Sequence, residues 1–271
     1  MAKEKYFVAN FSGGKDSTAM VLHLMETGAP LNEVINVDTG LEFPGMYEHI
    51  DKIKKIVQGY GIKYTTIKAA KGFDYWFSEH EFTTRQGEKK TGYSWPNRIA
   101  RWCTSRLKTE PIKAHMSPLL AKYDVYHYIG LAADEKERLQ RENNQNPSHI
   151  HPLVDWGWTE SDALKYCIAK GYDWGGLYEI FNRVSCWCCP LQRISELKKL
   201  WEHFPDLWEQ LKTWDSKTDR PFKDNLSVPM WEKRFELEET FKKQGLNSSM
   251  KTKAFRNALR EEFKKMGVNT R

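Results

Sequence analysis

The sequence predicts an α/β protein with a doubly wound, mainly parallel sheet, followed by an all-helical C-terminal extension. Strand-like and helix-like runs alternate through the first half of the 271 residues, which is the pattern of βαβ units. Polar turns that contain glycine follow two of these strands, at the edge where parallel sheets bind ligands. From residue 193 onward the pattern is helical. We therefore expect one domain over residues 1–192 and a helical extension over residues 193–271.

Apolar spacing places the elements of the first domain in order. The expected strands cover residues 6–11, 33–37, 63–67 and 125–131, and the expected helices cover residues 17–26 and 46–60. Residues 82–97 are polar and lack periodicity, so they predict a mobile loop near the ligand site. Residues 133–148 are similarly polar and predict a lid or a surface excursion. Thr159 and Asp162 predict the start of a further helix, with a capping box.

Aromatic and apolar residues at helical spacing characterise the extension. We expect its tryptophans to pack a core rather than to stack on bases; they are Trp201, Trp208, Trp214 and Trp231. Ser248 or Ser249 is expected to cap a last amphipathic helix. The apolar residues of that helix are Phe255, Leu259, Phe263 and Met266.

The segment 11–17, Phe-Ser-Gly-Gly-Lys-Asp-Ser, joins the first strand to the first helix. Its two glycines let the backbone turn sharply and approach a ligand closely. Amides at a helix N-terminus, two serine hydroxyls and the charge of Lys15 together suit a phosphate group. The spacing differs from that of the Walker loop. The sequence therefore predicts a phosphate-binding loop of another type.

Residues 38–40, Asp-Thr-Gly, follow the second predicted strand. Because the carboxyl ends of parallel strands meet at one edge of the sheet, we expect this turn and the glycine loop to converge on one ligand. Asp38 would contact that ligand or a metal ion, and its alternative role is that of a turn residue.

Composition limits the classes of protein to consider. The net charge of +6 comes from interspersed Lys and Glu, which favours a mixed, solvated surface over a dedicated nucleic-acid face, although the basic tail leaves a nucleic acid open as a partner. The charged N-terminus gives no sign of a signal peptide, and no apolar run reaches the roughly 18–20 residues of a membrane span. Five cysteines, an odd number, argue against a disulfide framework. We expect a cytoplasmic protein, either monomeric or oligomeric.

Residues 186–189, Cys-Trp-Cys-Cys, place three thiols in four positions, and Cys103 stands alone upstream. Thiolates at Cys-x-x-Cys spacing can converge on one metal centre. Three interpretations stay open: a 4Fe-4S cluster, a tetrahedral Zn²⁺ site, and thiols without metal. The ligands would be Cys103, Cys186, Cys188 and Cys189. In one version of the cluster Cys188 is instead a helper or resolving thiol.

The fifth cysteine is of a different kind. Cys167 lies on an apolar helix stripe, with Ala163, Leu164 and Ile168, and we expect it in the core.

Taken in their order along the chain, these motifs resemble those of the phosphoadenylyl-sulfate (PAPS) reductase family, which belongs to the adenine nucleotide α-hydrolase superfamily. Residues 12–17 resemble the pyrophosphate loop of that superfamily, and residues 37–44 resemble the segment after the second strand of the reductases. Cys103 with residues 108–111, then residues 130–138, resemble two further segments of the family. The order continues with Pro152-Leu153, Asp155-Trp156, Tyr178 and Cys186-x-x-Cys189. The resemblance covers residues 6–192, and it implies binding of ATP or adenylyl sulfate with Mg²⁺.

The chain also departs from the family. The reductases end in a tail whose cysteine attacks the sulfonate, whereas no cysteine follows Cys189 here. Reductases with an iron–sulfur cluster have two adjacent upstream cysteines, where this chain has Trp102 and Cys103. Leu131 stands where the family usually has arginine. We expect the fold and the nucleotide site to carry over, but not the reductase reaction.

The resemblance assigns roles to individual residues. The residues expected to bind the nucleotide are Ser12, Gly13, Gly14, Lys15, Asp16, Ser17, Asp38 and Gly130. The residues expected to act in catalysis are Lys15, Lys108, Arg138 and Cys188. Lys108 and Arg138 would clamp anions, or would simply be surface charges. Asp16 would hold the metal or orient the loop, and Asp134 and Glu135 would pair with the cations or bind metal.

The predicted function is to split ATP into AMP and pyrophosphate, activating an acceptor for sulfur transfer with a Cys-ligated iron–sulfur cluster. A sulfur-donor protein or thiol reductant would then be a partner, and a nucleic acid is one class of acceptor that the resemblance implies. The first alternative is a sulfonucleotide reductase that uses Cys188 or an external thiol. The second is a non-catalytic nucleotide-binding subunit or sensor with a structural metal.

Overall fold

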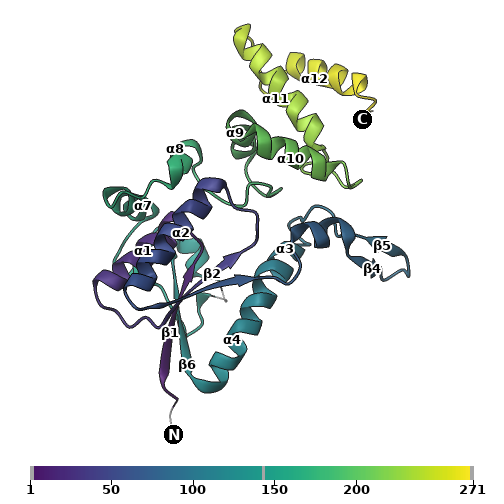
Figure 1. Ribbon diagram of the computed structural model, residues 1–271. Helices are drawn as coiled ribbons and strands as arrows, with labels where there is room; N and C mark the ends of the chain where they lie inside the picture. Colours follow the sequence, from purple (N-terminus) through teal and green to yellow (C-terminus); the bar gives the residue numbers. More distant parts are fainter. Residues whose placement is uncertain (1–2, 142–143, 269–271) are drawn as a thin grey trace. The chain divides into compact units, whose positions relative to one another are not determined.

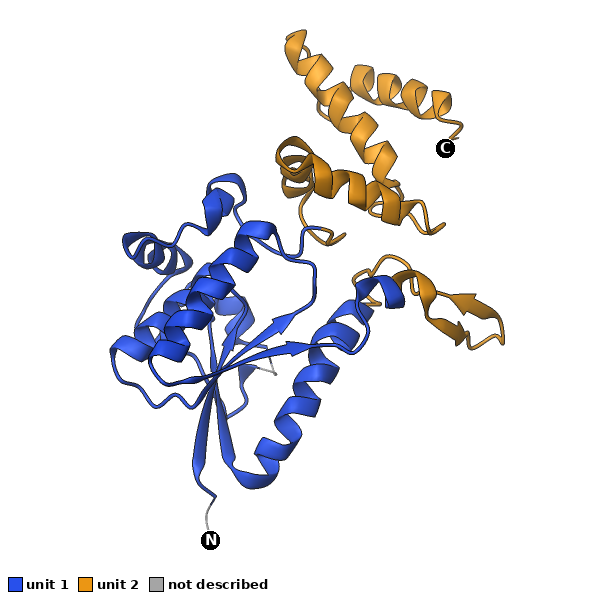
Figure 2. Cartoon of the chain, in the orientation of Figure 1, with its two compact units in different colours: residues 1–76, 101–187 blue, residues 77–100, 188–271 orange. Residues whose placement is uncertain are grey.

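The chain divides into two compact units in the computed structural model, which describes residues 3–141 and 144–268 (Figure 2). Unit 1 comprises residues 1–76 and 101–187, and unit 2 comprises residues 77–100 and 188–271. The sequence predicts two continuous domains that meet after residue 192, whereas unit 2 of the structure also includes residues 77–100. The reason lies in Trp95, whose buried indole Nε1 donates to Asp215 Oδ1 at 2.8 Å within unit 2.

Unit 1 is built on a five-stranded parallel sheet with the order β3-β2-β1-β6-β7 (Figure 1). Its strands are β1 (Lys5–Phe11), β2 (Glu33–Asp38), β3 (Lys63–Lys68), β6 (Asp124–Ile129) and β7 (His149–Ile150). The strand order reverses at β1, so its carboxyl end is the point at which doubly wound sheets bind ligands. The predicted α/β fold is confirmed. Sequence spacing missed β7, because two residues are too few to show a period.

Helices cover both faces of this sheet. α1 (Lys15–Glu26) and α2 (Pro44–Gly59) lie on one face, and α4 (Glu110–Lys122) lies on the other (Figure 1). α4 closes a core formed by side chains of four strands and one helix: Val8, Ile35, Ile67, Val125 and Met116. This burial of apolar residues against a parallel sheet contributes to the apolar stabilisation of unit 1.

Shorter elements complete unit 1. They are α3 (Trp102–Thr104), η2 (Ser105–Thr109), α5 (Lys136–Leu139), α6 (Pro152–Asp155), α7 (Glu160–Ala169), η4 (Trp174–Gly176) and α8 (Leu177–Ile180). The predicted capping box is confirmed, because Thr159 Oγ1 accepts from the Asp162 amide and the Asp162 carboxylate accepts from the Thr159 amide. The polar run 133–148 contains α5 and turns, and its residues 142–143 lie outside the described residues.

Unit 2 combines a hairpin with helices. The π-helical turn η1 (Tyr75–Glu79) leads into the antiparallel pair β4 (Glu81–Thr83) and β5 (Lys89–Thr91). The helices are α9 (Ile194–His203), α10 (Pro205–Asp215), α11 (Val228–Lys243) and α12 (Lys253–Lys265). The prediction of a loop over residues 82–97 is wrong for this hairpin, whose strands of three residues each are too short and polar to show alternation.

Packing in unit 2 follows the aromatic pattern. The Phe235 ring contacts those of Trp201, Trp208 and Trp231, so these tryptophans serve the core as predicted. The cap of α12 is Thr252, and the prediction of Ser248 or Ser249 is wrong, since the chain makes a turn after the serines in which Ser249 Oγ accepts from the Lys251 amide. Among the described residues, no helix combines the length and the apolar character that crossing a bilayer requires.

Candidate functional site

The loop between β1 and α1 brings bare backbone to the carboxyl end of the central strand. Gly13 has a φ of +83°, which side chains disfavour, and a Cβ there would lie 2.7 Å from Ile50 Cγ1 and from Met46 Sδ. Gly14 is the N-cap of α1 and offers no side chain to cap it. The first turn of α1 is therefore left open to a ligand.

Several donors at this helix end have no protein acceptor. No described residue accepts a hydrogen bond from the amides of Gly13, Gly14, Asp16 or Ser17. Unpaired amides at a helix N-terminus, together with the helix dipole, form an anion site. The loop thus has the geometry of a phosphate cradle.

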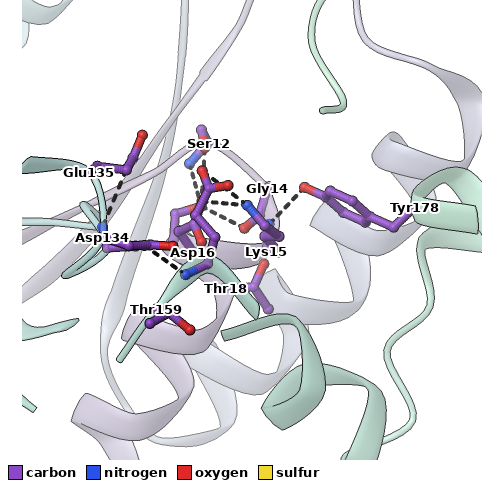
Figure 3. A network of polar contacts seen from close by, with 12 residues as sticks. Ser12, Gly14, Lys15, Asp16, Thr18, Asp134, Glu135, Thr159 and Tyr178 are labelled. Atoms are coloured by element: carbon purple, nitrogen blue, oxygen red, sulfur yellow. Dashed lines mark hydrogen bonds and ion pairs between the residues drawn. The ribbon is translucent and has the colours of Figure 1, made fainter. Parts of the chain in front are cut away.

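The remaining amide of this turn has a tyrosine as its acceptor. The Lys15 amide donates to Tyr178 Oη at 2.9 Å (Figure 3). Burial raises the pKa of Tyr178 above its ordinary value, so the phenol keeps its proton. No described residue accepts that proton, so the Tyr178 hydroxyl is a further donor toward the cradle. Tyr178 lies in α8, 163 residues after Lys15 along the chain. From the sequence it was predicted only as one of the motifs shared with the family.

Lys15 and Asp16 form the charged part of the site. Lys15 Nζ lies 3.1 Å from Asp16 Oδ2 and 3.4 Å from Glu160 Oε1, with most of its side chain buried. Burial raises the pKa of Asp16 to about 6, aided by Glu160 and Glu135 and opposed by Lys15. Asp16 Oδ1 is buried without a partner among the described residues. A hard cation such as Mg²⁺ fits this oxygen, since carboxylate oxygen is its preferred protein ligand.

A second layer of side chains holds the loop from behind. Trp174 Nε1 donates to the Gly13 carbonyl at 2.7 Å, and Thr18 Oγ1 donates to the same carbonyl at 3.3 Å. His49 Nε2 lies 2.9 Å from Thr18 Oγ1. When the Thr18 proton is directed to Gly13, a neutral His49 donates to Thr18 through Nε2. Burial lowers the pKa of His49 to about 4, which keeps it neutral. Sequence reasoning missed His49 and Trp174, which belong to no motif.

The predicted residues Ser12, Ser17 and Gly130 support the loop from within. Ser17 Oγ accepts from the Ser12 amide at 3.2 Å and donates to the Gly14 carbonyl at 3.0 Å. Gly130 follows β6, and a Cβ there would lie 2.9 Å from both Cα and N of Ser17. Gly130 therefore allows the end of β6 to touch the start of α1.

Asp38 lies at the carboxyl end of β2, next to the loop. It accepts from Tyr47 Oη at 3.1 Å and from the Gly40 amide at 2.9 Å, and it pairs with Lys68 Nζ at 2.7 Å. Burial alone would raise the pKa of Asp38, but these partners hold it below its ordinary value. A pocket of about 160 Å³ opens here, and the Thr39 hydroxyl beside it is buried without a described partner. Asp38 is thus an ionised residue that shapes the pocket wall.

The other predicted catalytic cations lie around this edge. Arg138 forms an ion pair with Glu135, whose second oxygen accepts from the Ala132 amide. Asp134 Oδ1 accepts from the Glu160 amide at 3.0 Å (Figure 3). The Asp134 contact links the turn before α5 to α7, whose Glu160 pairs with Lys15. Asp134 and Glu135 therefore both accept hydrogen bonds from groups of the protein.

Lys108 lies in η2 and its charge acts on Glu42. Burial raises the pKa of Glu42 against the opposing charge of Lys108. The Cys186 thiol donates to Glu42 Oε1 at 3.7 Å. One predicted cysteine ligand therefore lies in the same unit as the nucleotide loop, next to a buried carboxyl group.

The predicted metal ligands are divided between the units. Cys103 and Cys186 belong to unit 1, and Cys188 and Cys189 belong to unit 2. Within residues 3–141 and 144–268, no three His, Cys, Asp or Glu side chains are arranged to hold a metal ion. The cysteine centre stays a prediction. Cys167 is buried as expected, and burial raises the pKa of its thiol to about 12, so it is inert.

The sequence-family model of the phosphoadenosine phosphosulfate reductase domain matches residues 6–192 of this chain, from β1 to just after the cysteine motif. The chain belongs to this family. The resemblance inferred from the motifs is thereby confirmed, and with it an enzyme family whose domain binds nucleotides. The match ends before α9, so it leaves the four C-terminal helices outside the family domain.

Curated relatives add breadth but not a reaction. Two uncharacterized proteins of Methanocaldococcus jannaschii are 30% and 29% identical over 215 and 217 residues, or 76% and 78% of this chain. The chain spans only 41% and 48% of their length. Adenosine 5′-phosphosulfate reductase 2 of Bacillus subtilis is 27% identical over 166 residues, 58% of this chain and 61% of that protein.

Among solved structures, the U34-tRNA thiolase NcsA from Methanococcus maripaludis, with its [4Fe-4S] cluster, matches with a TM-score of 0.40. The sequence identity is 17%, and the match covers 87% of this chain and 74% of the thiolase.

Proposed function

We propose that this protein binds Mg²⁺-ATP through the glycine loop and transfers the adenylyl group to an acceptor, releasing pyrophosphate. The observation that carries the proposal is the row of unpartnered amides at the start of α1, beside Lys15 and the unpartnered oxygen of Asp16. A polyphosphate would satisfy the amides, and its metal would satisfy Asp16. The family match to residues 6–192 supports an adenine nucleotide as the ligand.

The chemistry follows from where charge develops. A nucleophilic atom of the acceptor attacks the α-phosphorus, the bond to the bridging oxygen breaks, and pyrophosphate leaves with the electron pair. With a nucleotide bound, the loop amides, Lys15 and the Tyr178 hydroxyl would donate to the pyrophosphate leaving group, where preorganised donors lower the barrier most. Mg²⁺ held by Asp16 would neutralise part of the charge on pyrophosphate. The family's sulfur chemistry would follow this activation, and we assign no step to a metal cluster.

A second candidate is reduction of a sulfonucleotide, which the adenosine 5′-phosphosulfate reductase relative favours. A thiolate would attack the sulfur of adenylyl sulfate and displace AMP, and a second thiol would then release sulfite as a disulfide forms. Since no cysteine follows Cys189, the attacking thiol would have to be Cys188 or an external thiol. Activity with adenylyl sulfate and dithiothreitol, read as sulfite release, tests this candidate.

Product analysis with ATP labelled at the α-phosphate in one experiment and at the γ-phosphate in another tests the primary proposal. AMP and pyrophosphate are the expected products, and ADP with phosphate would contradict it. Calorimetry with α,β-methylene-ATP and Mg²⁺ measures binding without turnover. Lys15→Ala should weaken this binding at least tenfold, because it removes a charge-assisted contact of about 1.5–3 kcal/mol. Lys55→Ala on the exposed surface of α2 is the matched control and should bind normally. No heat with the unaltered protein would overturn the proposal.

A further inference from the structure

The positive charge of the chain is concentrated at its C-terminal end. Residues 242–271 contain nine Lys and Arg but only two acids, whereas residues 1–241 contain 33 Lys and Arg and 34 acids. The whole net charge of +6 therefore comes from the last 30 residues, which carry +7 against −1 for the rest. Basic and acidic residues are thus nearly balanced over residues 1–241 and unbalanced over residues 242–271.

Within this segment, helical spacing gathers the cations on one side of α12. Lys253, Arg256, Arg260 and Lys264 follow one another at steps of three, four and four residues. At this spacing they share one face and extend over about 16 Å of helix. Three of them are exposed, and Arg256 is half-buried because its guanidinium donates to the carbonyls of Met250 and Lys251 at 3.0 Å. We call Lys253, Arg256, Arg260 and Lys264 the basic stripe.

The acids of α12 leave most of this charge uncompensated. Glu261 pairs with Lys264 at 2.7 Å, but both side chains are exposed, so the pair is weak. Glu262 pairs with Lys265, outside the stripe. Elsewhere in unit 2 the lysines are paired more closely; Lys198 Nζ lies 2.6 Å from Glu239 in a half-buried network. No ion pair to Lys253 or Arg260 occurs among the described residues.

The adjoining side of α12 is already occupied. Phe255, Leu259 and Phe263 are buried and pack against Met230 of α11. A basic amphipathic helix can insert its apolar face into a membrane surface, but this helix has no apolar face to spare. A ligand of the stripe would therefore bind by charge rather than by an apolar anchor.

We propose that the basic stripe of α12 binds the phosphate backbone of a nucleic acid. Phosphates repeat along such a chain, so several successive cations can each neutralise one, and the released counterions drive binding. The four cations lie in one row and present donors without an apolar anchor, which suits sequence-independent contacts. This surface is independent of the nucleotide loop, so its test does not depend on the proposed reaction.

Fluorescence anisotropy of the full chain with labelled single-stranded RNA, single-stranded DNA and duplex DNA tests the proposal in the absence of ATP. The test variant combines Lys253→Gln, Arg260→Gln and Lys264→Gln, and spares Arg256 because of its carbonyl contacts. The slope of log K against log salt should flatten by about 2 for single strands, and the Kd at 0.15 M salt should rise about 50-fold. The three nucleic acids show which backbone is preferred.

A matched control variant replaces exposed lysines of unit 1 by glutamine: Lys52, Lys55 and Lys122. It should change neither the slope nor the Kd, and circular dichroism should show that both variants are folded. Absence of binding at 50 mM salt, equal losses in test and control, or binding to phosphatidylserine vesicles with the same dependence on the stripe would each overturn the proposal.

Discussion

Replacement of Gly130 by alanine is the sharpest test of how the nucleotide loop is supported. The added Cβ would lie 2.9 Å from Cα and N of Ser17 and 3.1 Å from the Asp16 carbonyl carbon. Ordinary contacts at such atoms begin near 3.4 Å. These are backbone atoms, so no side-chain rotation relieves the overlap, and the start of α1 must move away from β6.

Overpacking of this kind costs about 1–3 kcal/mol. We expect Gly130→Ala to lower the free energy of unfolding by that amount, measured by urea denaturation. Because the amides of Asp16 and Ser17 move with the helix, affinity for α,β-methylene-ATP should fall at least tenfold in calorimetry.

Gly59→Ala is the matched control for this experiment. Gly59 ends α2, and no atom lies within 4 Å of the Cβ that alanine would add. Alanine there should leave nucleotide affinity unchanged and stabilise the helix by up to about 1 kcal/mol. If Gly130→Ala behaves like this control in both measurements, the contact between β6 and the loop does not exist as described.

Three further predictions concern the charged and reactive groups. Since burial raises the pKa of Asp16 to about 6, folding favours its protonated form, and wild-type stability falls as the pH rises through about 4 to 7. Asp16→Asn cannot ionise, so the unfolding free energy of this variant should exceed that of the wild type by a difference that grows from about pH 4 to pH 7, to at most about 3 kcal/mol. A difference that does not change with pH would refute the raised pKa of Asp16. Tyr178→Phe removes the acceptor of the Lys15 amide, which should cost about 1 kcal/mol of stability and weaken nucleotide binding five- to tenfold, whereas tighter binding would mean that Tyr178 only blocks the amide. Protein purified without oxygen should contain iron and sulfide and absorb visible light, a signal that Cys189→Ser abolishes and Cys167→Ser leaves intact; zinc or no metal would contradict the cluster.

The parts of the fold that depend on local sequence pattern could be predicted from the sequence. Strands β1, β2, β3 and β6 are rich in β-branched and aromatic residues, and the glycine loop is recognisable because two adjacent glycines precede a helix. Such features involve neighbours in the chain, so their physical meaning can be worked out residue by residue.

Most of the features that could not be predicted depend on contacts between residues far apart in the chain. Trp174 and Tyr178 reach the glycine loop from more than 160 residues away, and nothing in their own surroundings marks them as its supports. The hairpin at 81–91 joins unit 2 through Trp95 and Asp215, which lie 120 residues apart. The cap of α12 was misplaced for a local reason, because three candidate hydroxyls lie within five residues and backbone geometry selects Thr252.

The position of Tyr178 has a consequence for communication along the chain. The tyrosine that accepts from the Lys15 amide stands eight residues before Cys186. Through this hydrogen bond the start of α1 is joined directly to the segment that leads into the cysteine motif. If a nucleotide binds at the loop as we propose, the expected consequence is a change in the rate at which an alkylating reagent modifies Cys186, measured with and without α,β-methylene-ATP.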